Sequence, residues 1–285
     1  ETGPEDERVI RVEDVLSTLQ QLALNHRRQF EIPVLAITGS NGKTTTKELV
    51  HAVLSKRFRA HTTRGNLNNH IGIPLTILSM PAGTEFAVIE MGANHQREIA
   101  SYCSYVEPTH GLITNCGKAH LEGFGGVEGV RKGKGELFDH LRLHGGTAFV
   151  FTDTDYLREM SRGIGRIVTY GSSHADVTGN CRRSEPFLEV DMGGHTIHTR
   201  LVGAYNLPNI LAAVAVGRHF GVTEEDITDA IEGYEPSNSR SQLIRTQAGN
   251  EVILDAYNAN PTSMKAALEN LAAQSHPRKA VLIGG

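Results

Sequence analysis

Residues 34–45 read VLAITGSNGKTT, a continuous apolar run that leads directly into a glycine-rich turn. An apolar run of this length after Pro33 predicts a strand that is buried on both faces. Gly39 and Gly42 allow a tight turn whose backbone N–H groups point inward, and a following helix adds the positive end of its dipole. Phosphate groups bind to such turns. The segment therefore predicts an α/β fold of the P-loop type.

The turn carries the side chains that nucleotide phosphates and their metal ion require. Lys43 is expected to reach the β- and γ-phosphates, and the Thr44 hydroxyl to bind Mg²⁺. The general P-loop pattern has a glycine at the position of Ile37, so a glycine-rich turn with an incidental lysine stays open as an alternative. The expected nucleotide-binding residues here are Gly39, Ser40, Asn41, Gly42, Lys43, Thr44 and Thr45.

Strands and helices alternate along most of the chain, which favours a mostly parallel sheet covered by helices. Residues 174–203 break this alternation and predict a small antiparallel insert, and a second α/β (Rossmann-like) domain is expected to start near residue 242. The predicted strands are 34–38, 86–90, 110–114, 147–151, 166–170 and 279–283, with a hairpin at 242–246 and 251–255. The predicted helices are 13–29, 44–57, 95–105, 127–143, 206–220, 223–233 and 262–274, with a short helix between 151 and 166.

Composition excludes several classes of protein. The 285 residues carry a net charge of −4, and Lys and Arg form no stripe, so nucleic acid is not an expected partner. No apolar run approaches ~18 residues, so no membrane span is expected. Three cysteines without paired spacing favour a reducing compartment, and we expect a cytoplasmic monomer.

Several further segments resemble the Mur ligases and their folylpolyglutamate synthetase relatives, in the order in which that family has them. The resemblance covers roughly residues 30–285. The segments are TGSNGKT (38–44), AVIEMGAN (87–94), TNCGKAHLEGFGG (114–126), RKGKGELF (131–138), VGAYNLPNILAA (202–213) and SNSRSQ (237–242). The resemblance implies an ADP-forming ligase that activates a carboxylate as an acyl phosphate, which an amine then attacks.

The resemblance also implies a site with two Mg²⁺ ions. Thr44 and Glu90 would hold the first ion, and His120 and a carbamylated Lys134 the second, with Lys43, His120 and Lys134 as catalytic residues. A lysine ammonium cannot bind Mg²⁺, whereas a carbamate can, because it is an anionic oxygen ligand. The alternatives are a solvent-facing Glu90, a surface or packing His120, and a solvated basic helix start that includes Lys134.

Other residues are assigned by the same resemblance. Asn209 would contact adenine, Arg240 the phosphates, and Asp255 the ribose or a closing domain, while Tyr257 and Asn258 would lie near the nucleotide. Alternatively Asn209 caps a helix, Arg240 is a linker charge and Asp255 ends a hairpin strand. Asn66 and Asn69 are candidates for binding the muramoyl substrate, or they form turns.

Two segments, RGNLNNHIGIPLT (64–76) and DAYNANPTSM (255–264), resemble the MurF-type branch of the family. This branch joins D-alanyl-D-alanine to UDP-N-acetylmuramoyl-tripeptide. Four departures from the usual pattern are present: Tyr205 replaces His, Gln96-Arg97 replaces Pro-Gly, Gly133 replaces Ala, and Gly285 replaces Asp.

The same resemblance divides the chain into three parts. Residues 1–30 would end an N-terminal UDP-binding domain, 31–241 would form the central ATP-binding domain, and 242–285 would begin a truncated C-terminal domain. Turnover by this piece is therefore expected to be poor. The alternatives are another ligase of the Mur or folylpolyglutamate type, a different P-loop kinase or NTPase, and an ATP-binding module without turnover.

Overall fold

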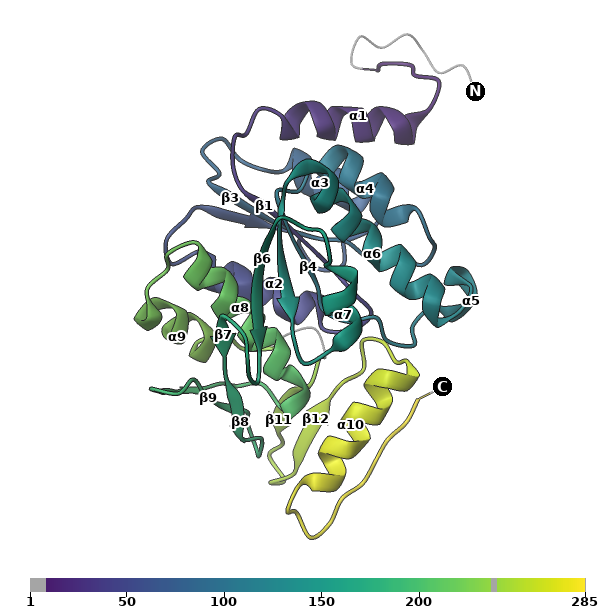
Figure 1. Ribbon diagram of the computed structural model, residues 1–285. Helices are drawn as coiled ribbons and strands as arrows, with labels where there is room; N and C mark the ends of the chain where they lie inside the picture. The colour runs from purple at the N-terminus through teal and green to yellow at the C-terminus, as the bar shows by residue number, and fades with distance from the viewer. Residues whose placement is uncertain (1–8, 237–239, 285) are drawn as a thin grey trace.

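The computed structural model describes residues 9–236 and 240–284 (Figure 1). Its centre is a seven-stranded sheet in the order β2-β3-β1-β4-β5-β6-β7, and all neighbouring strands are parallel. This confirms the predicted α/β fold. The strands are β1 (Val34–Thr38), β2 (Ala60–Thr62), β3 (Phe86–Glu90), β4 (His110–Ile113), β5 (Thr147–Phe151), β6 (Arg166–Gly171) and β7 (Val177–Thr178).

Helices cover both faces of the sheet and enclose two separate apolar cores. Successive strand residues point to opposite faces, so Leu35 and Ile37 join one core while Val34 and Ala36 join the other. The continuous apolar strands follow from this two-sided burial. The first core is closed by α2 (Lys43–Leu54), α8 (Leu207–His219) and α9 (Glu224–Glu232). The second is closed by α1 (Val15–Arg27), α3 (Gly72–Leu78), α4 (Glu98–Val106), α5 (Leu121–Phe124), α6 (Val127–His144) and α7 (Asp155–Met160).

Strand β1 lies between β3 and β4, so the chain turns to opposite sides of β1 as the sheet is built. In open α/β sheets ligands bind outside the carboxyl ends of the strands at such a point. The glycine-rich turn follows β1 at this edge, Glu90 ends β3, and Thr114 follows β4. The topology therefore gathers the predicted site. No helix in the described ranges is long and apolar enough to cross a membrane.

The predicted antiparallel insert is present as a three-stranded sheet, in the order β10-β9-β8. Its strands are β8 (Asn180–Arg183), β9 (Glu189–Asp191) and β10 (Thr196–His198). A short 3₁₀ turn, η1 (Ala204–Asn206), then leads into α8.

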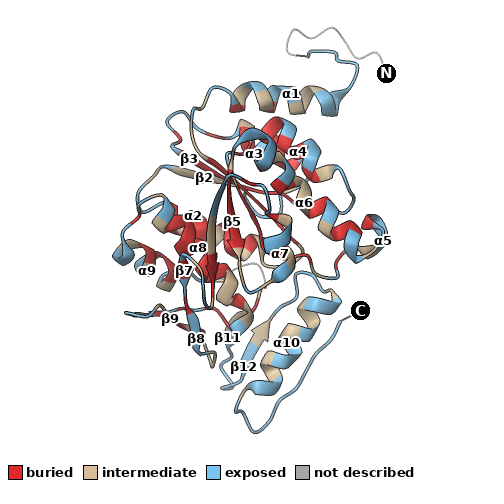
Figure 2. Cartoon of the chain, in the orientation of Figure 1, coloured by how far each residue is buried: buried red, intermediate tan, exposed pale blue. Residues whose placement is uncertain are grey.

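Residues 240–284 form a small unit with β11 (Gln242–Arg245), β12 (Glu251–Leu254) and α10 (Pro261–Ala273). The two strands form the predicted antiparallel hairpin, but α10 has no buried residue (Figure 2). The predicted strand at 279–283 is wrong. These residues form no strand and are exposed, with Leu282 at 100%, and in the described part of the chain β11 and β12 pair only with each other.

Candidate active site

The turn after β1 has a backbone that only glycine fits at two positions. Gly39 has φ +144° and Gly42 has φ +80°, both in the region that disfavours side chains. A Cβ on Gly39 would lie 2.0 Å from Thr114 Oγ1, and one on Gly42 would lie 2.6 Å from Asn209 Oδ1. The two glycines therefore allow the turn to pack closely against β4 and α8.

The two residues that follow β4 hold the turn through hydrogen bonds. Asn115 accepts the Ser40 N–H with its backbone oxygen (2.9 Å) and the Asn41 N–H with Oδ1 (3.1 Å). Thr114 Oγ1 donates to the Asn41 carbonyl at 2.6 Å. Sequence reasoning did not single out Thr114 and Asn115, although both lie in the quoted segment 114–126. These contacts fix the turn before any ligand binds.

Helix α2 begins at the turn without a capping side chain, since Gly42 is its N-cap. The first N–H groups of such a helix have no partner within the helix and suit an anion. Lys43 Nζ donates to the carbonyls of Gly39 (2.8 Å) and Ser40 (3.2 Å). Burial lowers the pKa of Lys43, the nearby Glu90 carboxylate opposes this shift, and the Arg240 charge adds to it. The ammonium thus lies across the turn, within the cavity described below.

Glu90 and Thr44, the predicted ligands of the first Mg²⁺, contact each other. Thr44 Oγ1 donates to Glu90 Oε1 at 3.2 Å, and Asn68 Nδ2 donates to the same oxygen at 2.7 Å. Glu90 is 1% exposed, so the alternative of a solvent-facing carboxylate is wrong. Its Oε2 atom is buried without a hydrogen-bond partner. A hydroxyl beside a buried carboxylate is a donor set that suits Mg²⁺.

Lys134 is buried, with only 2% of its surface exposed, so it does not belong to a solvated basic helix start. Its Nζ donates to the Ala93 carbonyl at 2.9 Å and lies 4.9 Å from the centroid of the Phe124 ring. A Cβ on Gly133 would lie 2.5 Å from that ring, so the glycine leaves room for Phe124. Burial, followed by the charge of Lys43, lowers the pKa of Lys134 to about 7.

His120 precedes α5 in a left-handed conformation with φ +53°. Its side chain is exposed but lines the same cavity as Lys134. Partial removal from water lowers the pKa of His120, and the charges of Lys134 and Lys43 lower it further. A neutral imidazole is the form that binds metal ions.

The residues assigned to the nucleotide come from two parts of the chain. Asn209 lies in the first turn of α8, where Oδ1 accepts from Thr46 Oγ1 at 3.0 Å and Nδ2 donates to Asn206 Oδ1 at 2.8 Å. The cap position is Asn206, so the alternative of Asn209 as a helix cap is wrong.

On the C-terminal side, the Arg240 guanidinium lies 3.8 Å from the centroid of the Tyr257 ring, and its Nε atom has no hydrogen-bond partner. Asp255 follows β12 and accepts a long hydrogen bond (3.4 Å) from Ser241 Oγ. Ser241 Oγ is also 2.7 Å from the Tyr205 hydroxyl, at the position where the family usually has His. Residues 237–239 of the SNSRSQ segment lie outside the described ranges.

Asn66 and Asn69 lie on the stretch between β2 and α3. Asn69 Oδ1 accepts the N–H groups of Ile71 (3.1 Å) and Gly72 (2.8 Å) at the start of α3, a turn-forming role. Asn68 was missed by sequence reasoning although it lies between the two predicted asparagines. It is the one of the three whose side chain contacts Glu90.

All the predicted residues line one cavity of about 620 Å³ at the carboxyl edge of the sheet. Among the described residues, no three His, Cys, Asp or Glu side chains are close enough together to hold a metal ion. Metal ions here would therefore depend on Thr44, Lys134 and phosphate oxygens as well. The predicted residues are Gly39, Ser40, Asn41, Gly42, Lys43, Thr44, Thr45, Asn66, Asn69, Glu90, His120, Lys134, Asn209, Arg240 and Asp255.

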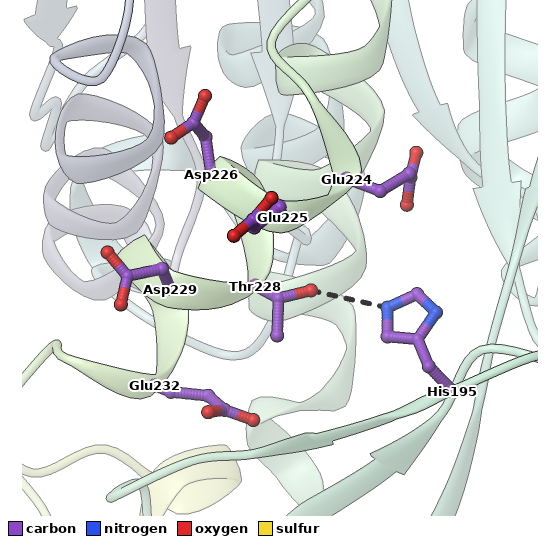
Figure 3. Close-up of a pocket in the computed structure, with 7 residues that line it drawn as sticks. All are labelled: His195, Glu224, Glu225, Asp226, Thr228, Asp229 and Glu232. Atoms are coloured by element: carbon purple, nitrogen blue, oxygen red, sulfur yellow. Dashed lines mark hydrogen bonds between the residues drawn. The ribbon is translucent and has the colours of Figure 1, made fainter.

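A second hollow lies on the surface of α9, away from this cavity. Figure 3 shows His195 pointing to Thr228, with Nε2 3.3 Å from the hydroxyl, while the carboxylates along α9 point in different directions. These acidic side chains do not converge on one point, and none belongs to a metal-binding group within the described residues. We assign this hollow no function.

Comparison with known proteins identifies the family. The family described as the Mur ligase middle domain matches residues 37–217, and the Mur ligase, glutamate ligase domain matches residues 239–285. The chain belongs to the Mur ligase family.

Among similar relatives of this Mur ligase is the UDP-N-acetylmuramoyl-tripeptide--D-alanyl-D-alanine ligase of Bacillus subtilis (strain 168). It is 39% identical over 270 residues, which cover 93% of this chain and 58% of the relative. MurF from Acinetobacter baumannii superimposes with a TM-score of 0.84 at 36% identity, covering 96% of this chain and 62% of that one. MurF from Thermotoga maritima, solved in complex with ADP, has a TM-score of 0.84 at 28% identity, covering 95% and 64%. The chain thus spans about 60% of the length of its relatives.

Proposed function

We propose that this chain is the ATP-binding part of a ligase that joins D-alanyl-D-alanine to UDP-N-acetylmuramoyl-tripeptide and forms ADP. One observation carries the proposal: the Thr44 hydroxyl and the buried Glu90 carboxylate are 3.2 Å apart, directly beside the phosphate turn. The names of the relatives support the substrates, since those from Bacillus subtilis and Escherichia coli are both UDP-N-acetylmuramoyl-tripeptide--D-alanyl-D-alanine ligases.

The reaction has two balanced steps. A carboxylate oxygen of the tripeptide attacks the γ-phosphorus of ATP, the bond from that phosphorus to the β,γ-bridging oxygen breaks, and ADP leaves. The amine of D-alanyl-D-alanine then attacks the acyl carbon, phosphate departs with the bond electrons, and the nitrogen loses a proton. Catalysis of the first step depends on positioning and charge neutralisation. The uncapped start of α2 and the ammonium of Lys43 supply both at the turn.

The remaining donors would hold two metal ions. Thr44 and Glu90 would hold one Mg²⁺, and His120 and Lys134 a second. Bound Mg²⁺ would neutralise phosphate charge during transfer. Asn209 would contact the adenine, Arg240 the phosphates and Asp255 the ribose. Asn66 and Asn69, which line the same cavity, would contact the muramoyl substrate.

Lys134 would join this set as a carbamate. Its neutral Nζ would add to the carbon of CO₂, one C=O electron pair would move to oxygen, and the nitrogen would release a proton to solvent. Burial of the amine and a pKa of about 7 support the modification, because a large fraction of the amine is then neutral near pH 7. Mass spectrometry of the native chain in bicarbonate buffer tests the modification. The chain should gain about 44 Da, the mass of the added CO₂, and the variant Lys134→Met should not.

The metal-dependent binding of nucleotide tests the proposed site. We expect a non-hydrolysable ATP analogue, titrated by calorimetry, to bind more tightly with Mg²⁺ than with EDTA. Glu90→Gln should reduce this Mg²⁺-dependent gain at least ~10-fold, since a metal ligand is lost. Glu85→Gln is the matched control: Glu85 lies just before β3 at the opposite edge of the sheet and pairs with Arg59. Equal Mg²⁺ dependence in the two variants would contradict the assignment of Glu90.

The ligase proposal has its own test. Continued ADP formation should require both the UDP-muramoyl-tripeptide and D-alanyl-D-alanine, because the acyl phosphate formed from the tripeptide is consumed only when the amine attacks it. ADP formation without either substrate would favour a kinase or NTPase, and use of another amino acid would favour a different Mur or folylpolyglutamate-type ligase.

A second candidate is an ATP-binding unit with little or no turnover of its own. Residues 240–284 attach to the rest of the chain by polar contacts, and α10 has no buried residue. This favours the second candidate, because closure between domains completes such sites. Nucleotide binding without ADP formation would support this candidate.

We also propose that residues 1–30, 31–241 and 242–285 belong to three domains, and that the protein is a monomer in the cytoplasm.

A further inference from the structure

Lys47 is a buried lysine that the proposed chemistry does not use. It lies on α2, one turn after Thr44, and is 1% exposed. Its Nζ donates to the Thr63 carbonyl at 2.8 Å and lies 3.9 Å from Glu90 Oε2 and 3.8 Å from Glu48 Oε1. Lysine is almost never fully buried without a partner, so its place beside Glu90 requires an explanation.

The two carboxylate oxygens of Glu90 have different surroundings. Oε1 accepts hydrogen bonds from Thr44 and Asn68 on the cavity side. Oε2 is buried, has no hydrogen bond and faces the Lys47 ammonium. Thr63 joins the two residues, because its carbonyl accepts from Lys47 and its Oγ1 accepts the Glu90 N–H at 3.0 Å. One carboxylate oxygen is thus directed to the phosphate turn and the other to an interior cation.

We propose that Lys47 is a positioning residue for Glu90: its ammonium holds Oε2 in the interior so that Oε1 stays beside Thr44, ready for a metal ion. The proposal rests on the proposed function, since it assigns Lys47 a role toward a ligand of Mg²⁺. Because residues three apart lie on the same helix face, α2 supplies both the hydroxyl of Thr44 and the cation behind the carboxylate. A purely space-filling role would be met by methionine, which has a similar length and no charge to remove from water.

Two electrostatic effects of Lys47 on a metal ion oppose each other. Its charge repels a cation at Glu90, which weakens binding, whereas its hold on Oε2 keeps the carboxylate oriented, which strengthens binding. We expect the second effect to be larger, because the ammonium lies beside Oε2 whereas Thr44 donates to Oε1, and Glu90 is nearly fully buried. Loss of groups that orient metal ligands typically lowers metal affinity ~10–100-fold.

The test measures the affinity of a non-hydrolysable ATP analogue with Mg²⁺ and with EDTA. In Lys47→Met we expect the Mg²⁺-dependent gain to fall ~10-fold or more, while the affinity in EDTA stays within about twofold. Lys47→Arg should restore most of the gain because it returns the positive charge. Lys56→Met is the matched control, since Lys56 follows the same helix but pairs with the exposed Asp229; it should behave as the wild type.

Each outcome decides the proposal. An unchanged Mg²⁺ dependence in Lys47→Met, or an equal loss with and without Mg²⁺, overturns it. If Lys47→Met does not fold, the double variant Lys47→Met/Glu90→Gln, which leaves no unpaired buried charge, is compared with Glu90→Gln. The proposal requires the same Mg²⁺ dependence in both, and an additional loss in the double variant overturns it. A wild-type chain that binds no nucleotide would refute the proposed function as well, whereas wild-type binding with an unaffected Lys47→Met refutes the inference alone.

Discussion

The body of the chain, residues 9–236, and its C-terminal segment, residues 240–284, contribute to the same cavity by different means. The body encloses two apolar cores, one on each face of a parallel sheet, and both contain fully buried residues. The C-terminal segment has no apolar core among its described residues, and α10 has no buried residue. It attaches by polar contacts: Asn260 Nδ2 donates to Asn41 Oδ1 at 2.6 Å, the Lys118 N–H donates to Thr262 Oγ1 at 3.1 Å, and Ser275 Oγ donates to Glu185 at 2.8 Å.

The difference indicates which half of the site is rigid. The phosphate turn, Glu90 and Lys134 are held by buried groups of the body, so their geometry exists without the C-terminal segment. Arg240, Asp255 and Tyr257 reach the cavity from the segment, whose hold on the body depends on a few hydrogen bonds. Polar contacts of this kind are individually weak in water. The segment is therefore the part that can be displaced when ligands enter or leave.

The largest difference between the regions should appear in stability. Phe86→Ala removes a side chain that is 0% exposed and lies edge-on to Phe220 at 4.6 Å between ring centroids. We expect it to lower the free energy of unfolding by ~3–5 kcal/mol, because a cavity remains in the first core. Leu268→Ala in α10, where Leu268 is 42% exposed, should cost no more than about 0.5 kcal/mol. Urea denaturation of both variants measures this, and similar losses would mean that the segment is as well packed as the body.

The second prediction concerns how the stability of the body depends on pH. His110 packs between Phe149 and Phe220, and burial, followed by the charges of His219 and Arg166, lowers its pKa to about 4. The unfolded chain binds a proton at this residue below about pH 6.5, whereas the folded chain does so only below about pH 4. The contribution of His110 to the free energy of unfolding should therefore be fully present above pH 6.5. The free energy of unfolding should fall by up to about 3 kcal/mol as the pH falls to 4.

His110→Phe keeps an aromatic ring and removes the titration. Its free energy of unfolding, measured between pH 7 and pH 4, should fall less steeply than that of the wild type. Parallel pH profiles for the two proteins would contradict the assignment of this loss of stability in acid to His110.

The third prediction addresses the contact between the two regions. Asn260→Ala removes the hydrogen bond to Asn41 in the phosphate turn and also the cap of α10. We expect nucleotide affinity to fall about 5-fold, which corresponds to one hydrogen bond of ~1 kcal/mol, while the unfolding of the body is unchanged. Ser263→Ala is the control, because it removes the partner of the Asn260 N–H in the capping box but leaves Asn41 paired. An equal loss of affinity in both variants would attribute the effect to the helix and not to the contact.

The body was also the part that the sequence predicted better. The ends of β1, β3 and β5 match the prediction because each strand is a continuous apolar run between polar residues. Strand β2 was missed, since its three residues are only partly buried and show no such run. Residues 279–283 form a similar apolar run, but no described strand pairs with them, and a strand requires a partner as well as a pattern.

The residues of the site were also predicted only where a local sequence pattern marks them. The spacing of glycine, lysine and threonine locates the phosphate turn, and the family segments locate Glu90, His120 and Lys134. Asn68, Asn115 and Lys47 were not found, because each acts through a side-chain direction that depends on residues distant in the chain. Lys47 leaves a faint signal, a lysine one turn after Thr44 on a helix face that also carries the apolar Val50 and Leu54.

The smallest predicted effect concerns a residue of the body whose backbone conformation is unfavourable. Arg97 precedes α4 with φ +71°, a left-handed conformation that costs most residues about 1–2 kcal/mol, and the family usually has glycine at this position. Arg97→Gly should relieve this cost but increase the entropy of the unfolded chain, for a net gain of about 0.5 kcal/mol. Arg97→Ala keeps the Cβ and should give no gain, although it removes the same side chain. Because the backbone N–H of Arg97 still donates to Glu136 in both variants, a difference between their melting temperatures would report the relief of backbone strain less the added entropy of the unfolded chain. A glycine variant no more stable than the alanine variant would show that the body accommodates this conformation without strain.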